Sequence, residues 1–199
     1  MRTMRHLFSN TEIHAPGFNG ATYFLTREYQ DTPVHKSRNT YLEPGMAFQM
    51  ATGRIPDLSD FCLEVAEMVN HTINLSSARQ FIPVMQKLHT LDIAQVKRFI
   101  KNPENRHVLM SNDRFEVVLI HWKPGKASDV HGHASGGCVF KLLQGKLEEI
   151  RYTPERSPKL LSMNSMRSGD MAYIDDRMAY HQVGNPYGTS AISVHVYVK

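Results

Sequence analysis

The pattern of hydrophobic positions changes its period part-way along the chain, near Pro103. Before that point, apolar residues recur every three or four positions after Pro56, which is the spacing of one face of an α-helix. The residues on this face are Leu58, Phe61, Val65 and Met68. A second helix is predicted over residues 77–88, with a break or kink at Pro83. A third is predicted from Asp92, which can cap its N-terminus.

Beyond Pro103 apolar and polar residues alternate with a period of two, as in β-strands. The first such segment is Phe115–Trp122, with the sequence FEVVLIHW. The further segments are Cys138–Leu143, Lys146–Tyr152, Leu160–Met166, Met171–Ile174, His181–Val183 and Ile192–Val198. Turn residues such as Gln144 and Gly145 separate them. Many short strands at this spacing predict an all-β barrel or jelly roll.

A length of 199 residues is enough for one domain with a sizeable core. We therefore predict a single domain over residues 1–199, mainly β, with a helical segment packed outside the barrel. Residues 1–55 are interpreted as an irregular arm with one short strand near residues 21–25, because turn residues are frequent there and periodicity is poor. Residues 56–103 form the helical segment, and residues 104–199 form the barrel.

The last predicted strand has two chemically different faces. Its apolar face carries Ile192, Val194, Val196 and Val198. Its other face carries Ser193, His195 and Tyr197. The helical segment is the available cover for the apolar face. Buried polar groups cost several kcal/mol unless they bond to one another or to a ligand. A polar barrel interior, and hence a site, explains this row best.

Two histidines, His131 and His133, are separated by one residue in a segment that we predict to be strand-like. A period of two places both imidazoles on one face, about 7 Å apart at the backbone, where they can converge on one ion. His181 lies on a later strand. In a chain with eleven histidines, an isolated pair of this kind is more often accidental or a surface pair.

The spacing around these histidines makes an accidental pair a poor explanation. Five residues separate Gly125 from His131, and four residues separate His133 from Cys138. Six more residues separate Cys138 from Gly145. This resembles the first cupin motif, with cysteine where many cupins have a glutamate ligand.

Downstream, the spacing His181-x3-Asn185 resembles the end of the second cupin motif, although Asp175, Asp176 and Arg177 replace its Pro-x-Gly part. Three neutral imidazoles without the glutamate would leave a ferrous ion with its full charge. That charge favours an anionic ligand such as a thiolate. Three histidines also suit zinc, so the ligand set alone leaves the metal open.

The segment from Arg106 to Tyr197 resembles the cysteine dioxygenase family. The pieces that carry the likeness are RHVLMSNDRFEVVLIHWKPG, HGHASGGCVFKLLQGKLEE, AYIDDRMAYHQVGN and SVHVY. The resemblance implies a cupin barrel in which His131, His133 and His181 bind Fe(2+).

The resemblance also implies roles for residues around the metal. Arg106 would hold the substrate carboxylate. Tyr197, supported by His195 and Ser193, would be the active-site tyrosine. Cys138 falls where animal-type members carry the cysteine that can form a thioether crosslink to this tyrosine.

Three features depart from the family pattern. Gly137 replaces a histidine of animal members, and Glu104 replaces an aromatic residue two positions before the arginine. The sequence ends at Lys199, whereas many members continue with a proline-containing segment. These departures concern the pocket wall and leave the metal ligands untouched.

The implied reaction adds both atoms of O2 to the sulfur of a small thiol. L-cysteine is the expected substrate, and another carboxylated thiol such as 3-mercaptopropionate is the nearest alternative. A non-catalytic cupin that binds a ligand is the rival from a different class, and a zinc- or nickel-loaded cupin isomerase is a third. The intact ligand set and the polar row on the last strand argue against a purely binding barrel.

Composition narrows the partners and the compartment. The net charge of +4 is spread thinly, so no basic block predicts nucleic-acid binding. No apolar run approaches the ~18 residues that span a bilayer, which predicts no membrane partner. Two cysteines are too few for a disulfide framework and favour a cytoplasmic protein, with a short organelle presequence as the alternative. We expect a monomer or a weak homo-oligomer.

Overall fold

The computed structural model describes residues 12–14, 22–24, 58–88 and 106–199. The helices are α2 (Ser59–His71), the 3-10 helix η2 (Ala78–Phe81) and α3 (Ile82–Lys87). The strands are β1 (Glu12–His14), β2 (Thr22–Phe24), β3 (Arg106–Ser111), β4 (Phe115–Trp122), β5 (Cys138–Gln144), β6 (Lys146–Tyr152), β7 (Leu160–Arg167), β8 (Met171–Ile174), β9 (Tyr180–Gly184) and β10 (Ala191–Val198). The third predicted helix, from Asp92, lies outside the described residues.

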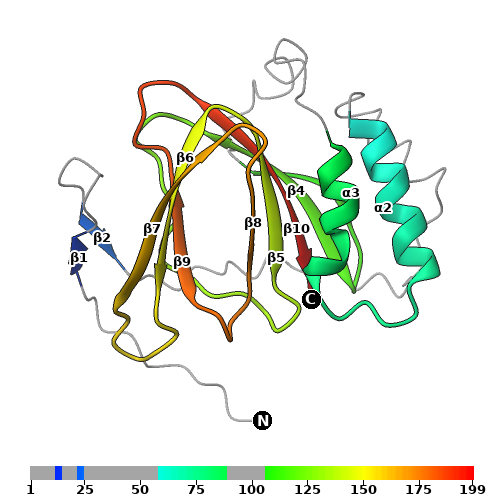
Figure 1. Ribbon diagram of the computed structural model, residues 1–199, viewed down its shortest axis with the longest axis horizontal. Coiled ribbons are helices and arrows are strands. Elements are labelled where there is room, and N and C mark those ends of the chain that lie inside the picture. The colour runs from blue at the N-terminus through cyan, green and yellow to red at the C-terminus, as the bar shows by residue number, and fades with distance from the viewer. Residues whose placement is uncertain (1–11, 15–21, 25–57, 89–105) are drawn as a thin grey trace.

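Two antiparallel sheets face each other and enclose the interior (Figure 1). One has the strand order β3-β4-β10-β5-β8, and the other has the order β7-β6-β9. Their inner faces share one apolar cluster, in which Phe140 and Leu142 pack with Leu147 and Val183. Over the described residues the two sheets do not join into one closed ladder. The predicted mainly β, cupin-type jelly roll is confirmed.

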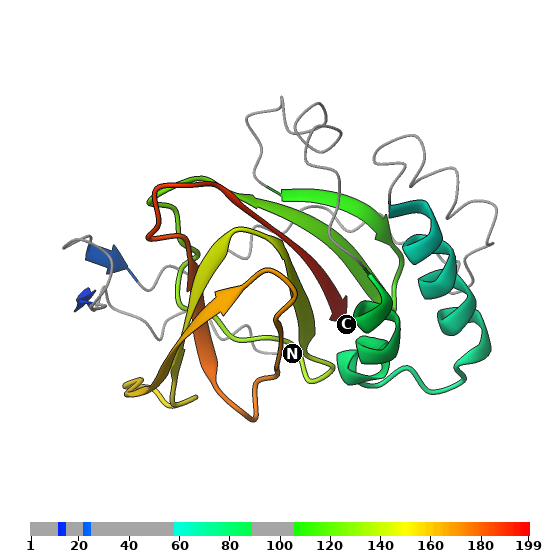
Figure 2. The ribbon, with the colours of Figure 1, turned by 45° about the horizontal axis from the view of Figure 1, so that its top comes forward.

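The helices cover the outer face of the five-stranded sheet, as Figure 2 shows. Phe81 of η2 and Phe115 of β4 are both fully buried, with ring centroids 6.0 Å apart. The apolar face of β10 packs into the same cluster, including Val194 and Val196. The prediction that helices cover this face of the last strand is therefore confirmed.

The break predicted at Pro83 has a simple local form. Ser77 caps η2, since its hydroxyl accepts from Arg79 N at 3.3 Å and its backbone N–H donates to Gln80 Oε1 at 3.2 Å. Pro83 then lies in the first turn of α3, where its missing N–H costs no hydrogen bond. The segment is thus a 3-10 turn followed by an α-helix.

No helix among the described residues is long and apolar enough to cross a membrane.

Most strand boundaries agree with the predictions to within one residue, and β4, β6 and β8 agree at both ends. In the N-terminal arm, β2 matches the predicted short strand, but its partner β1 was not predicted.

The sequence also suggests an exposed His107 at the start of a strand, and this is wrong. His107 is 5% exposed in β3, opposite Leu119. The single-domain division stays a prediction.

A buried lysine joins the helical segment to the sheet. Lys141 lies on the helix-facing side of β5, between Val139 and Leu143. Its Nζ donates to the carbonyls of Met85 at 3.0 Å and Leu88 at 2.6 Å, and to that of Gln86 at 3.2 Å. These are carbonyls at the C-terminal end of α3, which a cation stabilises. Burial lowers the pKa of Lys141.

We predict that Lys141→Met lowers the free energy of unfolding by about 2–3 kcal/mol, because the buried carbonyls lose a charged donor. Urea denaturation followed by circular dichroism measures the change. Lys126→Met, at an exposed loop position, is the matched control and should leave the unfolding free energy within about 0.5 kcal/mol of the wild type. Equal stabilities of the two variants would show that Lys141 does not hold the helix to the sheet.

Candidate metal centre

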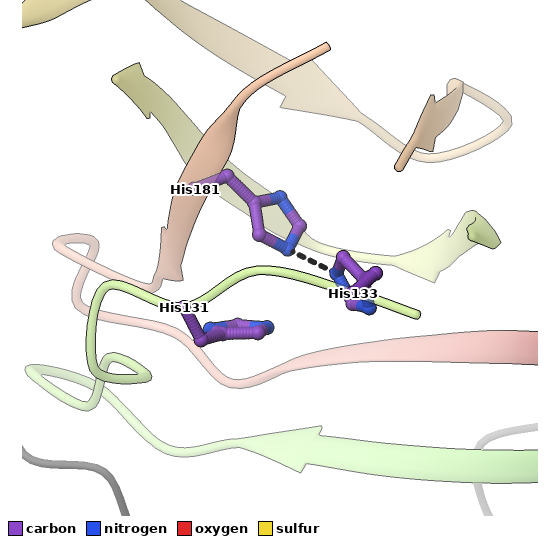
Figure 3. A group of neighbouring side chains, drawn as sticks. All are labelled: His131, His133 and His181. Atoms are coloured by element: carbon purple, nitrogen blue, oxygen red, sulfur yellow. Dashed lines mark hydrogen bonds between the residues drawn. The ribbon is translucent and has the colours of Figure 1, made fainter. Parts of the chain in front are cut away.

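Three histidines from two separate parts of the chain meet between the sheets (Figure 3). His181 lies on β9, and His131 and His133 lie in the segment between β4 and β5. The segment is predicted to be strand-like, but the structure has no regular strand there: it forms two isolated bridges, from Ala127 to Gly184 and from His131 to His181. The bridge of His131 consists of two backbone hydrogen bonds of 2.9 Å. One ligand nitrogen from each histidine lies within 4.8 Å of those of the other two.

Hydrogen bonds to the outer ring nitrogens orient two of these imidazoles. His131 Nδ1 lies 2.8 Å from the Asp129 carbonyl, and His181 Nδ1 lies 3.0 Å from Glu149 Oε1. Because both partners are acceptors, each Nδ1 carries the proton and each Nε2 keeps its lone pair. His181 Nε2 lies 2.9 Å from His133 Nε2. The Nε2 atoms therefore converge, as metal ligands do.

Burial keeps these imidazoles uncharged. Desolvation, helped by the neighbouring His181 and His131, lowers the pKa of His133 to about 2. Burial also lowers the pKa of His131, and it lowers that of His181 well below its usual value. A neutral imidazole is the form that binds a metal. The cluster therefore needs no proton loss to act as a ligand set near neutral pH.

Sequence reasoning missed the acid behind His181. Glu149 is 2% exposed and contacts both His181 and Arg151, whose Nε donates to its Oε2 at 2.9 Å. Arg151 Nη2 also donates to the carbonyl of Tyr173 at 3.1 Å. Burial raises the pKa of Glu149, and Arg151 opposes this shift. The sequence did contain the information, because alternation along β6 places Glu149 and Arg151 on the same inward face as Leu147.

The polar face of β10 forms a hydrogen-bonded chain beside the histidines. Trp122 Nε1 donates to Ser193 Oγ at 2.7 Å, and Ser193 Oγ lies 2.7 Å from His195 Nε2. His195 Nδ1 lies 3.4 Å from the hydroxyl of Tyr197. The Tyr197 ring lies 5.7 Å from that of His133, centroid to centroid. The structure therefore brings together the tyrosine row and the metal ligands, and adds Trp122 as a donor.

Cys138 lies on the same inward face as this row. It is fully buried and is the direct cross-strand partner of Tyr197, and its Sγ lies 3.8 Å from His195 Nδ1. Burial raises the pKa of the thiol, and a hydrogen bond with Tyr197 opposes the shift. The predicted placement of Cys138 beside the tyrosine is thus observed. The thioether between them stays a prediction.

The backbone explains why glycine stands at position 137. Gly137 has a φ of 73°, in the left-handed region that favours glycine. A Cβ there would lie 2.6 Å from the carbonyl oxygen of Ile174 and 2.8 Å from the hydroxyl of Tyr173. A histidine at this position would therefore strain the loop that leads into Cys138.

Arg106 lies at the edge of this arrangement. Its Nη2 forms an ion pair with Glu116 Oε2, and its Cζ is 5.9 Å from the centroid of the Tyr197 ring. Its side chain is 48% exposed. Arg106 therefore lies next to Tyr197, and the Tyr197 ring lies between Arg106 and His133. A carboxylate role for Arg106 stays a prediction.

Solved structures of similar shape include two proteins that are named for a cupin domain. A cupin-2 domain containing protein from Shewanella frigidimarina is 13% identical with a TM-score of 0.41, covering 55% of this chain and 94% of that one. A cupin 2 conserved barrel domain protein from Salinispora arenicola is 21% identical with a TM-score of 0.41, covering 56% of this chain and 91% of that one. TM-scores below 0.5 are too low to support a functional conclusion.

Sequence comparison is more specific. The chain is 33% identical to cysteine dioxygenase type 1 of Rattus norvegicus over 91 residues, and 32% identical to that of Homo sapiens. Each match covers 43% of this chain and 46% of the relative, so the chain spans about half the length of these relatives. The family model for cysteine dioxygenase type I matches residues 63–199. Since this match covers more than half of the chain, the protein belongs to the cysteine dioxygenase type I family.

Proposed function

We propose that this protein is a thiol dioxygenase that converts L-cysteine to cysteine sulfinic acid. In the reaction a thiolate and O2 combine to give a sulfinate, so both oxygen atoms bind the sulfur. The sulfur loses four electrons, and O2 gains them. The observation that carries the proposal is the set of three uncharged histidines beside Tyr197 and Cys138.

The donor set fits a divalent transition metal, and we propose Fe(2+). His131, His133 and His181 would hold it through their converging nitrogens. The cluster that the described residues form contains three histidines and no carboxylate. Neutral ligands leave the ion its full charge, which favours a thiolate. When bound, ferrous iron supplies the redox chemistry by which O2 reacts with a thiol sulfur. Membership of the cysteine dioxygenase type I family favours iron over zinc.

The row of hydrogen bonds from Trp122 through Ser193 and His195 to Tyr197 would set the position of the Tyr197 phenol proton. Trp122 can only donate, so Ser193 Oγ accepts from it and is able to donate its own hydrogen to His195 Nε2. Burial lowers the pKa of His195 well below its usual value, so the ring is neutral and its proton lies on Nδ1. Nδ1–H then donates toward the Tyr197 oxygen, so the phenol O–H acts as a donor, and Cys138 is its neighbour on the adjacent strand. The row thus makes the phenol a hydrogen-bond donor beside the metal ligands.

Arg106 would bind the carboxylate of the substrate. A guanidinium holds a carboxylate through two parallel hydrogen bonds, which fixes the orientation of the bound molecule. This contact would aim the thiol past the Tyr197 ring toward the histidines. L-cysteine has the required carboxylate and thiol. 3-Mercaptopropionate has both too and is the alternative substrate.

The first test is oxygen uptake by iron-loaded protein with L-cysteine, together with detection of cysteine sulfinate. Wild-type protein should consume about one O2 per sulfinate formed. His181→Ala should abolish uptake and lose most of the iron, because one of three ligands is gone. His71→Ala, at an exposed helical position, is the control and should keep both. Tight binding of L-cysteine without oxygen uptake would favour the rival interpretation, a non-catalytic binding cupin.

A second prediction concerns Glu149. Glu149→Gln should weaken iron affinity roughly 10-fold, because the carboxylate that orients His181 and raises its basicity loses its charge. Competition with a chelator measures the dissociation constant. Glu148→Gln is the matched control, since it removes the same charge from the opposite face of β6. Equal iron affinities in the two variants would remove Glu149 from the metal centre.

A third prediction concerns Arg106. Arg106→Ala should raise KM for L-cysteine at least 10-fold, since a charge-assisted contact contributes roughly 1.5–3 kcal/mol. It should change KM for cysteamine, which has no carboxylate, by less than about threefold. Steady-state oxygen uptake with both thiols gives the comparison. A similar increase for the two thiols would contradict the carboxylate role.

A further inference from the structure

An arginine is the direct cross-strand neighbour of one metal ligand. Arg151 of β6 stands opposite His181 of β9 in the antiparallel register. Directly opposite residues share a face of the sheet, with Cβ atoms about 4.5–5.5 Å apart. The side chain of Arg151 is only 20% exposed, although arginine is mostly exposed in proteins unless it is paired. A charged group is thus kept inside the protein beside the three histidines.

The guanidinium of Arg151 holds both oxygens of the Glu149 carboxylate. Nε donates to Oε2 at 2.9 Å, and Nη2 donates to Oε1 at 3.1 Å. Oε1 is also the atom that accepts from His181 Nδ1, at 3.0 Å. A carboxylate held at two points cannot rotate about its last bond without breaking one of these contacts. The fork therefore keeps Oε1 directed at His181, which keeps the other nitrogen of that ring directed at the remaining histidines.

The same guanidinium connects the two sheets. Its Nη2 donates to the carbonyl of Tyr173 in β8 at 3.1 Å. β8 belongs to the five-stranded sheet, and its next residue, Ile174, is the direct partner of Cys138. Arg151 thus joins the sheet that carries His181 to the strand beside Cys138. A guanidinium has five N–H donors in a planar fork, whereas a lysine has a single nitrogen and cannot hold both carboxylate oxygens in this way.

We propose that Arg151 is a positioning residue for the metal centre, which acts on His181 through Glu149 and fixes both against the strand beside Cys138. The hydrogen bonds of Arg151 go to Glu149 and Tyr173, so its effect on His181 passes through the carboxylate. The inference rests on the metal-binding part of the proposed function. It does not depend on which thiol is oxidised.

The first test is a double-mutant cycle on the binding of Co(2+) to metal-free protein, followed by the visible absorption of the bound ion. Arg151→Met should raise the dissociation constant roughly fivefold, because the carboxylate becomes free to turn away from His181. In the Glu149→Leu background the same substitution should change the dissociation constant by less than about twofold, since the group through which Arg151 acts is gone. Arg156→Met, at an exposed position in the loop after β6, is the matched control and should bind Co(2+) as the wild type does.

A second variant separates positioning from a purely structural role. Arg151→Met leaves a buried carboxylate unpaired, which also destabilises the fold. Arg151→Lys keeps a positive charge beside Glu149 and loses the fork. We expect Arg151→Lys to unfold in urea close to the wild-type midpoint, and to bind Co(2+) at least about threefold more weakly than the wild type. Wild-type stability together with wild-type Co(2+) affinity in Arg151→Lys would show that the arginine serves only the fold.

Turnover supplies a third comparison, with iron at saturation. Arg151→Lys should lower kcat for oxygen uptake with L-cysteine and leave KM unchanged, because the arginine acts on a metal ligand and not on the thiol. A raised KM with unchanged kcat would place Arg151 in substrate binding and overturn the inference. So would equal effects of Arg151→Met with and without the Glu149 carboxylate. If Co(2+) affinities follow the expected order but wild-type protein consumes no oxygen, the proposed reaction is wrong and the role of Arg151 stands.

Discussion

The burial of histidine side chains between two apolar sheet faces is the constraint on which the site depends. Burial lowers the pKa of His133, His181 and His195, so each ring is neutral and has one donor and one acceptor nitrogen. A buried donor must find an acceptor, and the Asp129 carbonyl and Glu149 carboxylate provide them for His131 and His181. Satisfying these donors also turns the acceptor nitrogens toward one another. Structural and chemical requirements are met by the same hydrogen bonds.

The register of β10 between β4 and β5 places chemistry and packing on opposite faces of the central strand. Val194 and Val196 pack under the helices, while Ser193 and His195 face the interior. A slip of one residue would exchange the two faces and bury the polar row in the helical core. The register is thus fixed by the apolar contacts with the helices. Packing outside the sheet thereby determines the position of the tyrosine inside it.

Two arginine–glutamate pairs illustrate how surroundings change the use of the same chemistry. The side chain of Glu149, which pairs with Arg151, is only 3% exposed, so its charge acts on His181 with little screening by solvent. Arg106 and Glu116 form the other pair at the rim, where solvent weakens the attraction. A buried pair that loses one partner leaves an uncompensated charge, whereas an exposed pair can rearrange around a ligand. The first pair suits positioning and the second suits recognition.

The sequence by itself determined the period-two strands, the inward row of Ser193, His195 and Tyr197, and the histidine spacing, because these depend on positions close together in the chain. Only the tertiary structure decided which distant residues meet: Glu149 behind His181, and Glu116 beside Tyr197. It also reversed the expected exposure of His107. Alternation within a strand tells which residues share a face. What covers that face, and which neighbour stands alongside, depends on the register between strands that are far apart in sequence.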